Sequence, residues 1–364
     1  MPRLRHRGPR TLTRYAHPPL AAGHIDAPHH LAPLGDLALE SGATIEDFAQ
    51  SYVTHGSLDA ERSNAILVCS ALTGTHHRLD FLIGEGRALD TRRYFIVATD
   101  PIGNGLSTSP SNRHAQPGMR VPRFFVRDMV AAQHRLLTGQ LGITHLRAVV
   151  GASLGGMQAI QWATSHPGFM DAIVAMTAMA KTPPWGALVV ETARACLIAD
   201  PAWTGEGFDG VPERGWRAYA GLINALAMHT PEAAAELAPH DDVHAWYETI
   251  VDQTRAQGFD ATDYLYQSWA YQAHDVGTTA GFGGDTARAL ASSRDRALIV
   301  APPITAPAIA PGTLTSPPRS STTWWRSTQQ RCSGGPTTAR TELTRTVCSR
   351  SWGAPRYSGG GAAT

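Results

Sequence analysis

The chain has 364 residues, of which 17% are charged, and its formal net charge is +1 at pH 7. This length suits one domain that carries an insertion better than two separate domains. The near-neutral charge gives no basic surface for a nucleic acid or an anionic membrane, and no apolar run approaches the roughly 20 residues that cross a bilayer. The expected partner is therefore a small-molecule substrate.

The N-terminal segment is rich in arginine and lacks the apolar stretch of a secretory signal. We expect residues 1–36 to form a disordered leader. This interpretation is favoured over a targeting peptide, and a misplaced start codon would give the same composition.

The cysteines have neither metal-type spacing nor a paired framework; they are Cys69, Cys196, Cys332 and Cys348. Unpaired thiols fit a reducing compartment. A cytoplasmic protein without a bound metal or cofactor is therefore expected.

Short apolar runs alternate with helical stretches over residues 37–182, and a further apolar run follows at 297–301. Continuous apolar runs are typical of strands covered on both faces, and they occur at 65–69, 94–99, 146–150, 172–176 and 297–301. Helical spacing of apolar residues is found over 125–141 and from position 154 to 165. Strands separated by helices need crossover connections, so the sequence predicts an α/β fold whose mostly parallel central sheet is flanked by helices.

Residues 183–296 contain no comparable strand. They are rich in Ala, Trp and Tyr and show helical periodicity. We interpret this segment as a helical cap inserted between two strands of the sheet, with residues 297–303 forming the core strand that follows it.

The composition changes abruptly at residue 304. Residues 304–364 contain no Asp, His or Lys, and Glu342 is their only acidic residue. A disordered, irregular tail is one interpretation, because low apolar content cannot offset the entropy of ordering. The stray Trp and Cys residues favour the other interpretation, a frameshifted C-terminus read from a GC-rich gene.

The segment Gly151-Ala-Ser153-Leu-Gly155 follows an apolar strand and opens a helix. In that context the G-x-S-x-G pattern predicts a nucleophile elbow, in which flanking glycines avoid clashes and the serine lies at a helix N-terminus. Ser153 is therefore the candidate nucleophile of an α/β-hydrolase fold. The alternative is a glycine-rich turn with a capping serine.

An oxyanion hole needs two backbone donors. The N–H of Leu154 is the first candidate, and the loop Ser70-Ala-Leu-Thr-Gly74 supplies the second through Ala71 or Leu72. Ser70 and Thr73 could instead cap the next turn. For His76 and His77, just beyond this loop, we expect a surface role rather than metal binding.

Several motifs together resemble the homoserine O-acetyltransferase family, including its esterase relatives. They are Ser153-Leu-Gly-Gly-Met-Gln-Ala-Ile-Gln-Trp-Ala163, Arg127-Asp-Met-Val130, Leu141-Gly-Ile143, Ala71-Leu-Thr-Gly74, Tyr264-Leu-Tyr266 and Ala273-His-Asp-Val-Gly277. The resemblance implies a ping-pong reaction, as used in methionine biosynthesis. Ser153 would take an acetyl group from acetyl-CoA, as co-substrate, and pass it to a small hydroxyl acceptor.

The chain departs from the transferases in two segments. Residues 100–112 resemble the loop of the esterase relatives, and the cap segment 217–230 matches poorly the arginine-bearing stretch that would hold an amino-acid carboxylate. Homoserine as acceptor is therefore doubtful. The candidates for substrate contact are Arg217, Tyr219 and His274, with an exposed arginine and a structural histidine as the alternatives. The acyl length and the oligomeric state stay open, with a homodimer through the apolar cap as one option.

The triad of this fold runs Ser, acid, His along the chain. No carboxylate follows the strand at 297–301 closely, and no histidine follows His274. A serine without a base is a poor nucleophile at neutral pH, so we expect the chain as written to be nearly inactive. An acyltransferase, an esterase and a non-catalytic binding protein are the three competing hypotheses.

Overall fold

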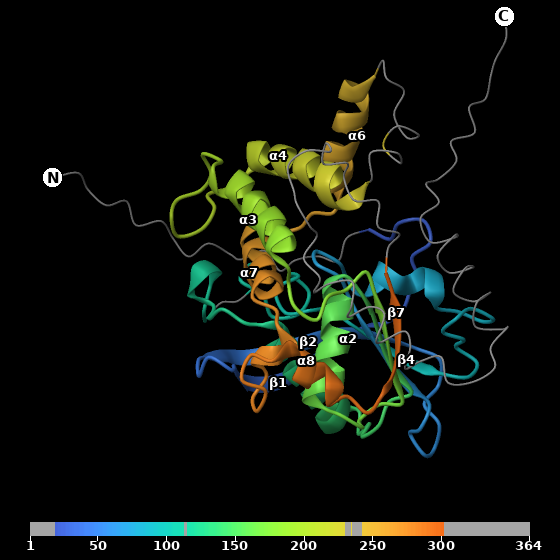
Figure 1. Cartoon of the computed structure of the whole chain (residues 1–364). Helices are drawn as coiled ribbons and strands as arrows, with labels where there is room; N and C mark the ends of the chain where they lie inside the picture. The colour runs from blue at the N-terminus through green and yellow to red at the C-terminus, as the bar shows by residue number, and fades with distance from the viewer. Residues whose placement is uncertain (1–18, 113–114, 230–233, 235–241, 302–364) are drawn as a thin grey trace, which may run out of the picture.

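The computed structural model describes residues 19–112, 115–229, 234 and 242–301 (Figure 1). The predicted tail 304–364 and the first 18 residues of the predicted leader lie outside the described residues. The described chain forms one seven-stranded sheet in the order β1-β2-β4-β3-β5-β6-β7. Its strands are β1 (His29–Ala38), β2 (Thr44–His55), β3 (Ala65–Cys69), β4 (Phe95–Thr99), β5 (Ala148–Ala152), β6 (Ala172–Met176) and β7 (Arg296–Val300).

Five neighbouring strands of the sheet run parallel to one another, as the alternation of strands and helices predicts. They are β4, β3, β5, β6 and β7. β3 and β6 have the predicted bounds, and the other predicted strands begin or end within two residues of the observed ones. Side chains alternate between two hydrophobic clusters. Leu67 and Cys69 belong to one cluster, while Ile66 and Val68 belong to the other, so the parallel strands are buried on both faces.

The first two strands were not predicted. β1 pairs antiparallel with β2, and β2 pairs antiparallel with β4. Ala32 and Leu37 of β1 are buried in the larger hydrophobic cluster. The expectation of a disordered leader through residue 36 is therefore wrong from His29 onward, because this segment covers the edge of β2 and buries apolar side chains.

The remaining elements are helices and helical turns. They are η1 (His76–Leu82), η2 (Gly118–Arg120), α1 (Val126–Arg135), η3 (Leu136–Gln140), α2 (Leu154–Ser165), α3 (Pro184–Ile198), α4 (Glu213–Ile223), η4 (Asn224–Met228), α6 (Val243–Ala256), α7 (Ala261–Gln272), η5 (Val276–Thr278) and α8 (Thr286–Ala291). α2 fills the predicted range after the elbow. Its Trp162 is fully buried and donates a hydrogen bond to Gln133 Oε1 of α1 at 2.8 Å. No helix in the described part of the chain is long and apolar enough to cross a membrane.

A helical cap rises from the sheet between β6 and β7, as predicted (Figure 1). It consists of α3, α4, η4, α6 and α7. The base of the cap closes where Lys181 and Asp275 form an antiparallel bridge, with Lys181 Nζ and Asp275 Oδ2 2.8 Å apart. η5 and α8 then contact α2 of the core. The cap therefore ends about 20 residues earlier than the predicted boundary at 296, because Ala289 of α8 is buried in the core cluster.

Two stacked histidines join the ends of α1 and α2. The rings of His134 and His166 lie 4.2 Å apart and nearly parallel, beside Trp162 and Phe169. Burial, aided by the neighbouring His134, lowers the pKa of His166 from 6.5 to about 4. The unfolded chain therefore takes up this proton at a higher pH than the folded chain does.

We expect the contribution of His166 to the free energy of unfolding to be complete above pH 6.5 and to fall as the pH drops from 6.5 toward 4. Urea unfolding across this range measures the loss. In the variant His166→Gln the free energy of unfolding should fall less steeply over this pH range, because the titration of His166 is removed. Some pH dependence should remain, because other buried histidines still titrate. Equal slopes in the variant and the unmodified chain would contradict the prediction.

Candidate active site

Ser153 lies at the junction of β5 and α2, where the sequence predicts the elbow. Its backbone has φ 54° and ψ −122°, a conformation that non-glycine residues rarely adopt. The N–H of Ser153 donates to Met176 O at the end of β6 at 2.9 Å, which fixes this turn to the neighbouring strand. The residue is half-buried. The hydroxyl therefore stands at the carboxyl edge of the parallel strands and at the N-terminus of α2, where the helix dipole favours negative charge.

The glycines around Ser153 are required by close backbone contacts. A Cβ on Gly151 would lie 2.1 Å from Gly155 O, and a Cβ on Gly155 would lie 2.2 Å from Cys69 O. The same Cβ on Gly155 would lie 2.8 Å from Ser70 O. The elbow therefore packs directly against the end of β3 and the start of the loop that follows it, and any side chain at these positions would separate the two.

The loop 70–74 is the predicted source of the second oxyanion donor. Gln158 of α2 donates to Ser70 O at 3.2 Å, which ties the loop to the elbow helix. Thr73 has a positive φ of 58°, and its N–H donates to Gln267 Oε1 of α7 at 3.0 Å. Leu72 thus lies between two fixed points of the loop. The structure brings this loop beside the elbow, where Leu154 N–H opens α2 without an acceptor inside the helix.

The floor of the cap covers this loop. The side chain of Leu72 packs against a hydrophobic cluster that includes Tyr219 of α4 and Tyr264 of α7. The rings of Tyr219 and Tyr264 meet edge to face with centroids 4.9 Å apart, and burial raises the pKa of both phenols. Tyr219, a predicted substrate contact, is therefore near the oxyanion loop as an apolar wall that stays un-ionised at neutral pH.

Arg217 points away from that wall. Its guanidinium forms two hydrogen bonds with Glu248 of α6 and lies over the Tyr247 ring at 5.2 Å from the centroid. The hydrogen bonds to Glu248 raise the pKa of Arg217 and lower that of Glu248. A substrate carboxylate would have to displace Glu248 to use this arginine, and its predicted role in substrate binding stays a prediction.

His274 lies at the end of α7, where the cap returns to the core. Its side chain is buried, and its backbone oxygen accepts a hydrogen bond from Thr182 N–H at 2.9 Å. Burial, together with the charge of Arg127, lowers the pKa of His274 to about 4. The imidazole is therefore neutral at neutral pH. A hydrogen bond with the Met179 backbone acts in the opposite direction, toward a higher pKa. Contact between His274 and a substrate remains a prediction.

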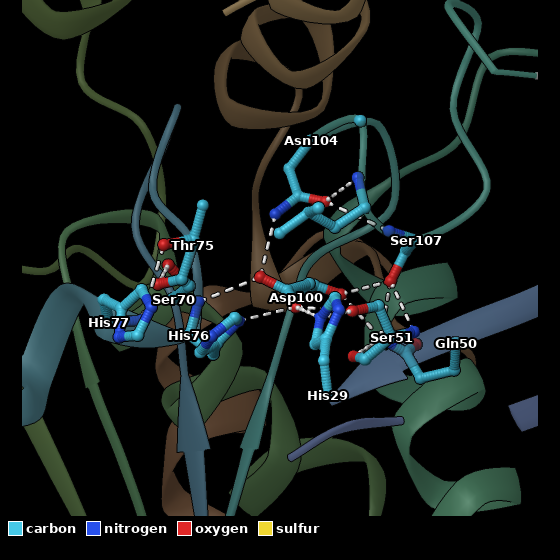
Figure 2. A network of polar contacts seen from close by, with 12 residues as sticks. His29, Gln50, Ser51, Ser70, Thr75, His76, His77, Asp100, Asn104 and Ser107 are labelled. Atoms are coloured by element: carbon cyan, nitrogen blue, oxygen red, sulfur yellow. Dashed lines mark hydrogen bonds and ion pairs between the residues drawn. The ribbon is translucent and has the colours of Figure 1, made fainter. Parts of the chain in front are cut away.

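A buried polar network follows β4 (Figure 2). Asp100 is fully buried, with Oδ1 accepting hydrogen bonds from His76 N–H and Asn104 Nδ2 at 2.9 and 3.1 Å. Burial alone would raise the pKa of Asp100, but hydrogen bonds from His29, His76 and Ser51 hold it below its usual value. Asn104 Nδ2 also lies 3.2 Å from Gly74 O, so the network supports the far end of the oxyanion loop.

Sequence reasoning misjudged or missed several members of this region. The expected surface role of His76 and His77 is wrong, because both are buried, and His77 Nδ1 lies 2.7 Å from Asp80 Oδ2. Gln267 was missed altogether, since it lies 194 residues from Thr73 in the chain. The run of glycine, asparagine and serine over residues 100–112 is the sequence signal for the polar network, because it contains Asp100 and Asn104.

The position at which the fold calls for a catalytic acid is not in the described residues. β7 ends at Val300, and description of the chain stops at residue 301. The sequence beyond holds no Asp, no His and, as its only acid, Glu342. No triad acid or histidine can therefore be assigned.

A strained serine between a parallel strand and a helix, packed against the loop that follows β3, is the arrangement of the α/β-hydrolase fold. The profile of the alpha/beta hydrolase fold matches residues 64–206. The chain belongs to the homoserine O-acetyltransferase-like family of this fold, whose members are acyltransferases and esterases.

Named relatives include both activities. The homoserine O-acetyltransferase of Moorella thermoacetica is 34% identical over 67% of this chain and 74% of its own length. A probable esterase of Corynebacterium glutamicum is 31% identical over 76% of this chain and 80% of its own length. The solved acetyl esterase MekB superposes with a TM-score of 0.70 and 31% identity, covering 74% of this chain and 79% of MekB.

Coverage is lower for another relative. The homoserine O-acetyltransferase of Methanohalophilus mahii is 32% identical over 70% of this chain, which spans only 58% of that enzyme's length.

Proposed function

We propose that the chain carries out acyl transfer through a covalent ester on Ser153, and that its turnover is slow because it lacks the triad acid and histidine. The observation that carries this proposal is the elbow itself, with Ser153 at φ 54° and ψ −122° at the N-terminus of α2. The strain of this turn is explained if the turn serves to expose the serine hydroxyl to a substrate.

The first half-reaction forms the acyl-enzyme. Ser153 Oγ attacks the acyl carbon of the donor, the hydroxyl proton leaves to water, and the bond from carbon to the donor's leaving group breaks. In acetyl-CoA, the donor implied by the family, that leaving group is a thiolate. The N–H groups of Leu154 and Leu72 would stabilise the tetrahedral oxyanion, a contribution that is worth about 10²–10³ in rate per donor in other enzymes.

The second half-reaction passes the acyl group to an acceptor. A small hydroxyl compound would give a transferase, and water would give an esterase. Both acceptors need a base to remove a proton, and such a base typically contributes about 10²–10⁴ in rate. Acylation of Ser153 needs the same base, so both half-reactions are expected to be slow. We also propose that the protein is cytoplasmic and that it forms a homodimer through the cap.

Hydrolysis of acyl esters is the second candidate function. Two observations favour it. The only arginine assigned to a substrate carboxylate, Arg217, is held by Glu248, and the solved relative with 31% identity is an acetyl esterase. Release of CoA from acetyl-CoA, measured with and without an added hydroxy amino acid, separates the two. Dependence on the amino acid indicates a transferase, and equal release in water alone indicates an esterase.

A fluorophosphonate probe tests the role of Ser153. We expect slow but complete labelling of the purified chain, a mass shift of one adduct, and no labelling of Ser153→Ala. The matched control is Ser165→Ala, at the other end of α2, where the hydroxyl accepts a hydrogen bond from Gln161 at 2.9 Å. This variant should label as the unmodified chain does. A folded chain that takes up no probe would support the non-catalytic hypothesis and contradict the proposal.

A further inference from the structure

The described residues place three metal-ligating side chains together at the carboxyl edge of the sheet. His29 comes from β1, His76 opens η1 after the oxyanion loop, and Asp100 follows β4 directly. Their donor atoms all lie within 4.8 Å of one another. Figure 2 shows both imidazoles beside the Asp100 carboxylate, and their ring centroids lie 5.0 Å apart. No spacing motif announces this cluster, because its members come from separate segments of the chain.

The distances suit a transition-metal ion. His76 Nδ1 lies 3.0 Å from Asp100 Oδ2, and His29 Nε2 lies 3.3 Å from the same oxygen. Ligand atoms around a tetrahedral zinc ion, bonded at about 2.0–2.2 Å, are roughly 3.3 Å apart. The side chains of Asp100 and His76 are almost fully buried, with 0% and 3% exposed, whereas 34% of the His29 side chain is exposed. Asp100 and His76 therefore form the buried part of the cluster, and solvent reaches the cluster at His29.

We propose that His29 Nε2, His76 Nδ1 and Asp100 Oδ2 form a binding site for one divalent transition-metal ion. Two imidazoles and one carboxylate are a donor set that zinc and iron sites use, and imidazole favours such ions over magnesium or calcium. Each imidazole binds the ion in its neutral form, with its proton on the other ring nitrogen. The ion takes the place of the protons that the imidazoles share with Asp100 Oδ2.

The hydrogen bonds to the other carboxylate oxygen of Asp100 can remain in place around the ion. The hydrogen bonds from His76 N–H and Asn104 are made to Asp100 Oδ1, not to Oδ2. Ser51 Oγ lies 2.6 Å from both His29 Nε2 and Asp100 Oδ2, so an ion bound to these two atoms would replace the hydrogen bonds that the hydroxyl makes with them. Since Asn104 also contacts Gly74 O, a bound ion would brace the end of the oxyanion loop.

Metal titration of the intact chain tests the site. The chelator-treated, full-length protein is titrated with Zn²⁺ by calorimetry, and the Co²⁺ adduct is followed by its visible spectrum. We expect one equivalent of zinc to bind tightly. The variant His29→Gln should weaken this binding at least about tenfold and change the Co²⁺ spectrum, because a direct ligand is lost. The titration needs no acyl donor, so its result is independent of the reactivity of Ser153.

The matched control is His30→Gln. His30 is the next residue on β1, so its side chain points to the opposite side of the strand, and its ring stacks on Tyr52 at 5.1 Å. This variant should keep the affinity and the spectrum of the unmodified chain. Equal zinc binding by His29→Gln and His30→Gln, or no stoichiometric binding by the unmodified chain, would overturn the proposal and leave a hydrogen-bond network only. His29 lies partly exposed near the sheet edge, so its variant should fold even if a variant of buried Asp100 does not.

Discussion

Replacing residues 302–364 with the corresponding C-terminal segment of the Corynebacterium glutamicum relative is expected to raise esterase turnover at least about 10³-fold. β7 ends at Val300 with its parallel register to β6 intact, so the graft begins where the fold presents the triad acid. A triad acid and histidine would activate Ser153 and protonate the leaving group, and loss of a triad member costs about 10⁴-fold or more in serine proteases of unrelated fold. Hydrolysis of p-nitrophenyl acetate measures the change.

Two controls accompany this chimera. The chimera with Ser153→Ala should return to the background rate, and the chimera in which the grafted histidine is replaced by alanine should fall to the rate of the unmodified chain. A folded chimera that is labelled by the fluorophosphonate probe yet hydrolyses the ester no faster would show that the missing triad is not what limits this protein.

Gly155→Ala is expected to lower the free energy of unfolding by about 3 kcal/mol or more. The added Cβ would lie 2.2 Å from Cys69 O and 2.8 Å from Ser70 O. Both oxygens belong to backbone at the buried end of β3, so neither can move aside without breaking the contact between the elbow and the oxyanion loop. Urea unfolding measures the loss, and any protein that remains folded should label more slowly with the fluorophosphonate probe.

Gly139→Ala is the matched control for this substitution. Gly139 lies in η3 and is exposed, and a Cβ added to it would meet no described atom within 4 Å. Its replacement should change the free energy of unfolding by less than about 1 kcal/mol, because alanine only reduces the freedom of the unfolded chain. Similar losses in the two variants would mean that the close approach at Gly155 does not hold the elbow in place.

The pattern of consecutive residues correctly predicted those elements whose formation depends on neighbours in the chain. The apolar runs of β3 and β6 and the helix after Ser153 have the predicted bounds, because burial on both faces and helical periodicity are written in consecutive residues. The same reasoning failed for β1. Its apolar residues form no continuous run because Pro33, Gly35 and Asp36 interrupt them, and only pairing with β2 makes it a strand.

The surroundings of the site required the three-dimensional structure. The predicted exposure of His76 and His77 was wrong, since burial of polar rings depends on their partners Asp100 and Asp80. The pairing of Arg217 with Glu248 joins two cap helices that the periodicity of the segment cannot align. Such contacts depend on how distant elements are packed together.

The sequence by itself determined that a serine stands on a sharp turn between strand and helix, because the glycines and apolar runs that impose this turn are its immediate neighbours. Only the tertiary structure decided what surrounds that serine. Gln267 of the cap reaches Thr73 of the oxyanion loop, and His29, His76 and Asp100 meet from three segments. Contacts over such separations follow from strand order and crossover packing, which no local pattern of residues specifies.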